Sequence, residues 1–90
     1  ENWRQLRLHA LEAVAGVLAT AGRFGEAVSA AQAAVRADPL RESPHAALIG
    51  VHLAEGNQSE AVREFDCYRR RLGAALGLEP TARLRALVPR

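Results

Sequence analysis

"GRFGEAV" at residues 22–28 recurs as "GNQSEAV" at residues 56–62, which is 34 positions further along the chain. The two segments share Gly, Glu, Ala and Val at matching places. A glycine just before a helix-forming segment is typical of the point where one helix ends and the next begins. Self-similarity at a fixed period of this length is typical of stacked repeat units. The sequence therefore predicts two copies of one structural unit.

The composition favours helices packed on helices. Of the 90 residues, 49% are apolar, but only four are aromatic and nineteen are alanine. Alanine is the strongest helix former, and its small side chain lets two helices approach closely. No segment shows a strand pattern. We therefore expect a single all-α domain.

Apolar residues with helical spacing predict five helices, at about residues 3–21, 24–37, 44–55, 57–76 and 81–88. The apolar positions of the first helix share one broad face: Trp3, Leu6, Ala10, Leu11, Val14, Val17, Leu18 and Ala21. The positions of the fourth helix that we expect to face inward are Ala61, Val62, Phe65, Tyr68, Leu72 and Leu76.

Glycine, proline and capping residues mark the ends of these helices. The first, third and fourth helices end at glycines, which are Gly22, Gly56 and Gly77. Pro39 stops the second helix, because proline disfavours helical geometry in the residue before it. Ser43 is expected to cap the third helix, and Asn57 opens a capping-box sequence for the fourth.

A 34-residue period with two helices per unit is typical of the tetratricopeptide repeat. Repeat one is predicted at about residues 8–41 and repeat two at about 42–75, in a right-handed helical solenoid. Ala27 and Ala61 are the small residues at which paired helices touch. A C-terminal capping helix at about 81–88 is expected to cover the open end of repeat two with Leu84, Leu87 and Val88.

In the predicted arrangement of repeats, no helix covers the start of the chain as the C-terminal helix covers its end. Solenoids normally need about three units, since each repeat buries its face only against a neighbour. The apolar surface around Trp3 and Leu6 is therefore expected to be exposed. It predicts an upstream helix pair or a partner.

The charge pattern favours a solvated surface over a nucleic-acid interface. The twelve basic residues are all arginine, the formal net charge is +2, and acidic residues are interspersed with the basic ones. A single cysteine cannot form an internal disulfide, and no apolar run is long enough to cross a membrane. We therefore expect a soluble, cytoplasmic domain.

Several motifs go beyond a generic repeat. They are the Asp-Pro-Leu-Arg-Glu linker at residues 38–42, Tyr-Arg-Arg at 68–70 and Leu-Gly-Leu-Glu-Pro at 76–80, with Trp3 at the entry to the first helix. In this combination the chain resembles the bacterial transcriptional activator domain of actinobacterial antibiotic-pathway regulators. The resemblance covers essentially the whole chain, although the family's domain ordinarily begins about one repeat earlier.

The resemblance implies a module that helps a DNA-bound regulator to dimerise and to engage RNA polymerase. The expected partners are therefore a second copy of the protein, RNA polymerase, or both. DNA would be bound through an upstream winged-helix domain that is absent from this chain. The alternative is a generic tetratricopeptide adaptor that binds a peptide or a partner helix in its concave groove.

Two glycines stand out within helices. Gly16 and Gly50 are 34 residues apart, and each lies mid-helix, where glycine costs roughly 1 kcal/mol relative to alanine. Their absent side chains would let a partner approach the backbone, or would serve close packing within the solenoid. The candidate groove surface consists of His9, Glu12, Gly16, Ser43, Ala46 and Gly50.

Arg70 and Cys67 are weaker candidates on the fourth helix. Arg70 points outward from the run of three arginines at residues 69–71, so it is either a charged contact to a partner or part of a solvated flank. Cys67 has Arg63 and Arg70 on its own side, and cations favour a reactive thiolate. An incidental surface thiol is the favoured interpretation of Cys67.

Catalytic and metal-binding chemistry finds no support in the residue pattern. The three histidines are His9, His45 and His52, and the last two are seven residues apart. Zinc-binding helices instead use pairs such as His-x-x-x-His with further ligands. The sequence therefore predicts no enzyme, no cofactor and no bound small-molecule substrate.

Overall fold

The computed structural model describes residues 2–89, which form five α-helices. They are α1 (Asn2–Thr20), α2 (Phe24–Ala37), α3 (Glu42–Ala54), α4 (Gln58–Leu76) and α5 (Ala82–Leu87). No strand occurs among residues 2–89. The all-α fold that the composition favours is therefore confirmed.

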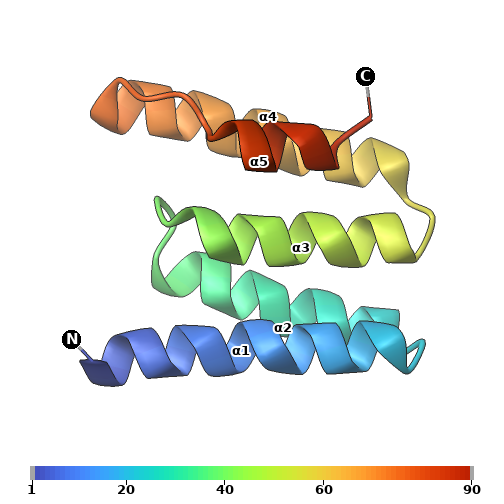
Figure 1. Ribbon diagram of the computed structural model, residues 1–90. Helices are drawn as coiled ribbons and strands as arrows, with labels where there is room; N and C mark the ends of the chain where they lie inside the picture. Colours follow the sequence, from blue (N-terminus) through green and yellow to red (C-terminus); the bar gives the residue numbers. More distant parts are fainter. Residues whose placement is uncertain (1, 90) are drawn as a thin grey trace.

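The helices form a flat, tetratricopeptide-like stack measuring 37 × 36 × 18 Å (Figure 1). α1 and α2 make an antiparallel pair, α3 packs against both of them, and α4 packs against α3. α5 runs back in front of α4 and contacts α3. The helices α1, α3 and α5 thus share one layer, and α2 and α4 lie behind it.

The two glycine turns at the ends of α1 and α3 have the same geometry. Gly22 and Gly56 adopt left-handed φ angles of 80° and 79°, a conformation that favours glycine. In each turn the residue after the glycine donates its N–H to a carbonyl five residues back, over 2.8 Å: Arg23 to Leu18, and Asn57 to His52. These bonds satisfy carbonyls that the helix end leaves without a partner. The repeated segment therefore encodes a repeated turn.

The capping prediction is right for α4 and wrong for α3. The Asn57 side chain accepts a hydrogen bond from the Glu60 N–H over 3.4 Å, as the capping-box sequence predicts. α3 begins at Glu42, and no side chain caps it. Ser43 instead donates its hydroxyl hydrogen to Glu12 on α1. The contact of Ser43 with Glu12 on α1 thus replaces the predicted cap at the start of α3.

Two apolar clusters fill the stack, and α3 contributes to both. The first cluster joins α1, α2 and α3 through Ala15, Ala27, Ala31, Leu48 and Val51. The second joins α3, α4 and α5 through Ile49, Ala61, Phe65, Tyr68, Leu72 and Leu84. Alanines at the α2 contact allow the close helix approach that the composition suggests. The second cluster is closed by α5, whose Leu84 is 1% exposed.

Two leucines that we expected to be buried are exposed. Leu76 is the last residue of α4, and the contribution of that helix to the second cluster ends one turn earlier, at Leu72. Leu87 is exposed because α5 is only six residues long and buries Leu84 alone. Val88 follows α5 and does pack against the second cluster, as predicted.

Candidate protein-interaction surface

One side of α1 exposes a continuous row of apolar residues. We call it the α1 apolar face, and it comprises Trp3, Leu6, Ala10, Ala13, Val14, Val17 and, directly after the helix, Ala21, all exposed. Trp3 is 77% exposed, Leu6 64% and Val17 69%. The spacing of three and four residues keeps these positions on one side of a helix. The expected exposure around Trp3 and Leu6 is confirmed and extends along the whole helix.

The inner side of α1 uses different residues. Leu8 and Ala15 are buried at 1% and 0% exposure, and Leu11 and Leu18 are half-buried. The broad stripe predicted for this helix is therefore split between two sides, because Leu11 and Leu18 turn inward and the other members turn outward. Leu8 and Ala15 are seven residues apart, as are Leu11 and Leu18, so the inner side also has a regular helical spacing in the sequence.

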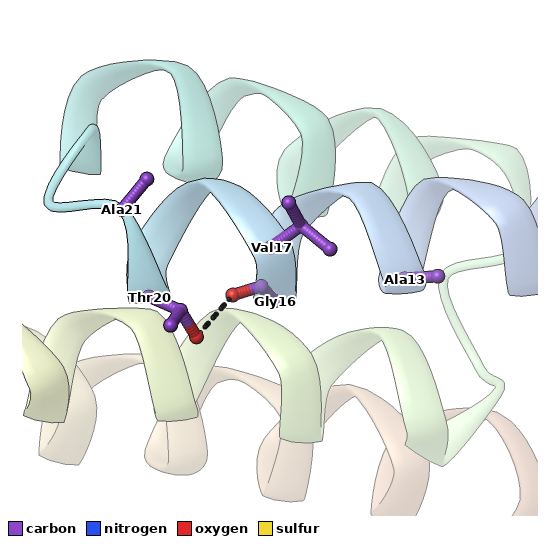
Figure 2. A pocket seen from close by; sticks show the side chains of 5 residues that line it. All are labelled: Ala13, Gly16, Val17, Thr20 and Ala21. Atoms are coloured by element: carbon purple, nitrogen blue, oxygen red, sulfur yellow. Dashed lines mark hydrogen bonds between the residues drawn. The ribbon is translucent and has the colours of Figure 1, made fainter.

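A shallow hollow overlaps the α1 apolar face (Figure 2). Its lining consists of Ala13, Gly16, Val17 and Thr20 of α1 and Ala21, which directly follows the helix. Thr20 donates its hydroxyl hydrogen to the Gly16 carbonyl over 2.9 Å, which leaves little polar surface free in the hollow. The hollow is thus an open, apolar surface of α1 beside its partner helices.

The α1 apolar face has a buried counterpart on α3. Ala47, Leu48 and Val51 stand 34 residues after Ala13, Val14 and Val17. In α3 these residues pack into the first cluster against the pair of helices that precedes them. The exposed face of α1 therefore resembles in composition the face of α3 that packs against the preceding helix pair.

Three predicted groove residues meet in a polar network between α1 and α3. Ser43 donates to the Glu12 carboxylate over 2.8 Å, and Arg41 donates to His9 Nε2 over 2.9 Å. Arg41 also donates to the Ser43 hydroxyl over 3.3 Å, which links the two pairs. The sequence-based set did not include Arg41, because nothing in the local spacing marks it as the link.

The other groove candidates differ in their surroundings. Gly16 and Gly50 are exposed, and no heavy atom lies within 4 Å of the place where a Cβ would stand on either. Close packing inside the domain therefore does not require these glycines. Ala46 is half-buried and packs against the second cluster.

Arg70 and Cys67 are both exposed on α4. The neighbouring Arg69 forms an ion pair with Asp66 at 3.7 Å. Cys67 lines a hollow with Arg36 and Arg71, so its cationic neighbours there differ from the pair expected from sequence.

The buried histidines have structural partners. His45 is 2% exposed and lies 2.5 Å from Glu64 through Nδ1 and 2.7 Å from the Pro39 carbonyl through Nε2. His52 Nδ1 lies 3.3 Å from a Glu55 carboxylate oxygen. Within residues 2–89, no three His, Cys, Asp or Glu side chains gather as a metal site.

The fold and its exposed faces define a class, a tetratricopeptide-like helical module with an open apolar side. A family model described as the bacterial transcriptional activator domain matches residues 1–90, and the chain belongs to this family. The predicted membership of the bacterial transcriptional activator domain family is therefore confirmed. The chain has no significant match among curated proteins or among solved structures. In the part of the chain that the structure describes, no helix is both long enough and apolar enough to span a bilayer.

Proposed function

We propose that this transcriptional activator domain is a non-catalytic interaction module of a DNA-binding regulator. Its contact with a protein partner uses the α1 apolar face. The observation that carries the proposal is the exposure of Trp3, Leu6 and Val17 along one side of a single helix. Contiguous exposed apolar surface is typical of protein interaction sites.

The free energy available at this face is substantial. Complete burial of one Leu or Val side chain contributes about 1.5–3 kcal/mol. Leu6 and Val17 are both more than 60% exposed, and the larger Trp3 is more exposed still. Most of the free energy of burying these side chains can therefore be gained only when a partner covers them.

The shape of the face favours a helical partner. Ala10 and Ala13 lie between the larger residues, so a second helix can approach the α1 backbone closely. The buried counterpart on α3 packs in this way against α1 and α2. Self-association through α1 is thus our first candidate for the dimerisation of the regulator.

Engagement of RNA polymerase is the second part of the proposal. The groove surface around Gly16 and Gly50 and the exposed Arg70 are our candidates for that contact. Open space at both glycines also supports the alternative function, a peptide-binding adaptor. The two functions differ in the partner, so binding experiments separate them.

Fluorescence anisotropy of the chain carrying a fluorophore at its C-terminus tests the proposal. The labelled chain is titrated with unlabelled chain and, separately, with RNA polymerase holoenzyme. The variant carrying Leu6→Glu and Val17→Glu is expected to weaken self-association at least about tenfold, since charges then face the partner. Leu78→Glu is the matched control, because Leu78 is 55% exposed but lies outside the α1 apolar face.

Each outcome has a clear reading. Self-association that survives the double variant contradicts the role of the α1 apolar face. Polymerase binding that Gly50→Arg weakens supports the groove as the polymerase contact. Absence of binding to either titrant contradicts the proposal and favours the peptide adaptor.

A further inference from the structure

A second hollow lies where side chains of α2, α3 and α4 come together. Its volume is about 350 Å³. Gln32 and Arg36 of α2, His45 of α3, and Glu64, Cys67 and Arg71 of α4 line it. None of these residues belongs to the α1 apolar face or to the groove surface. The chemistry of this hollow is therefore independent of the proposed function.

The acidic residue of the hollow, Glu64, contacts the buried ring of His45. His45 has an acceptor at each ring nitrogen, the Glu64 carboxyl group at Nδ1 and the Pro39 carbonyl at Nε2. Within residues 2–89, Glu64 pairs with His45 and with neither arginine of the hollow.

The two arginines of the hollow, Arg36 and Arg71, differ from four other arginines of the described chain in their lack of an acidic partner. Arg23, Arg63, Arg69 and Arg85 each form an ion pair with an acidic side chain, at 2.5 to 3.7 Å. Neither Arg36 nor Arg71 forms an ion pair with any other residue in the range 2–89. The hollow therefore holds two guanidinium groups that no carboxylate within residues 2–89 pairs with. The Gln32 amide supplies a further neutral donor.

We propose that this hollow binds an oxyanion, a carboxylate or a phosphate, between Arg36 and Arg71. Guanidinium groups present parallel N–H donors that match two oxygens of such groups. Val35 also lines the hollow, which is open to solvent at the exposed side chains of Arg36 and Arg71. The oxyanion is either a free small anion or an acidic side chain of a bound protein.

Two-dimensional NMR of the ¹⁵N-labelled chain tests this site. Inorganic phosphate and a blocked tetraglutamate peptide are titrated separately, with sodium chloride adjusted to constant ionic strength because salt screens exposed charges. Saturable shifts are expected at the amides of Arg36, Cys67 and Arg71. Arg36→Gln and Arg71→Gln are each expected to weaken binding about tenfold or more, since a hydrogen bond to a charged group is worth at least that factor.

Arg63→Gln is the matched control, because it removes an α4 arginine that is paired with Glu60 and lies outside the hollow. Saturation by phosphate identifies a small-anion site, and saturation by the peptide alone identifies an acidic side chain as the ligand. Shifts that are absent, or that persist equally in Arg36→Gln, Arg71→Gln and Arg63→Gln, overturn the proposal. The α1 double variant leaves this readout unchanged, so failure here is distinct from failure of the proposed function.

Discussion

Glu42 accepts two hydrogen bonds from Thr81, one from the backbone N–H over 3.0 Å and one from the hydroxyl group. The two residues are 39 positions apart, so the first turn of α3 holds the start of α5. The same Thr81 hydroxyl accepts a bond from the Leu84 N–H over 3.3 Å and caps α5. One side chain thus both begins the last helix and fixes it to the stack.

Replacement of this threonine should loosen α5. Thr81→Ala removes the cap and one bond to Glu42, and it is expected to lower the free energy of unfolding by about 1–2 kcal/mol. Urea denaturation followed by circular dichroism measures the change. Thr20→Ala is the matched control, because the Thr20 hydroxyl bonds only within its own helix, to Gly16. Equal effects of the two substitutions would contradict the role of Thr81.

The His45–Glu64 pair makes a second stability prediction. His45→Ala leaves the Glu64 carboxyl group and the Pro39 carbonyl without their buried partner, and it is expected to cost about 3 kcal/mol. The ring also stacks on Tyr68 with centroids 4.2 Å apart, and that contact is lost too. His9→Ala, at an exposed position, should cost less than about 1 kcal/mol. A small loss for His45→Ala would show that the pair contributes little.

Tyr68 should make the domain sensitive to alkali. Burial raises the pKa of its phenol, and the negative charges of Glu42 and Asp38 raise it further. The unfolded chain therefore loses this proton first, at about pH 10. Stability is full below that pH and falls as the pH rises above it.

Alkaline denaturation of the wild type and of Tyr68→Phe measures this effect. Tyr68→Phe loses the hydrogen bond to the Leu40 carbonyl, about 1 kcal/mol at neutral pH, but it should show a weaker decline above pH 10. Tyr68 is the only tyrosine, so tyrosinate absorbance reports its titration directly. Both proteins are compared in a Cys67→Ser background, which leaves no thiol in the chain. Parallel declines of the two proteins would contradict the prediction.

The mid-helix glycines should be open to stabilising substitution. Gly50→Ala adds a methyl group where no heavy atom lies within 4 Å, and it is expected to stabilise the fold by about 0.5–1 kcal/mol. Gly56→Ala should destabilise it, because Gly56 has a φ of 79°. Thermal unfolding of both variants compares the two effects. Destabilisation by Gly50→Ala would contradict the prediction.

Features that depend on local chemistry were predictable from sequence. Gly22 and Gly56 each follow a helix and adopt a left-handed conformation. Asn57 caps α4, which begins at the next residue. Ala27 and Ala61 are fully buried, as expected of the small residues at helix contacts. The 34-residue period therefore predicted the helix pairs and their turns without knowledge of any distant contact.

Features that depend on distant partners were not predictable in the same way. Ser43 has the local pattern of a cap, but Glu12, 31 residues away, takes its hydroxyl hydrogen. Arg41 links His9 to Ser43, and only the packing of α3 on α1 brings them together. Which side of α1 turns inward likewise depends on where α2 and α3 lie, since both sides of that helix carry apolar residues.

Adjacent residues of α3 belong to different clusters, Leu48 to the first and Ile49 to the second. The central helix α3 is thus part of both apolar clusters, and the opening of either half of the stack exposes the α3 residues that pack against that half. Cooperativity in such arrays depends on nearest-neighbour interfaces of this kind. A ligand that raises the opening free energy of α1 and α2 therefore also protects the amides of α4 and α5 from hydrogen exchange, although it touches neither helix.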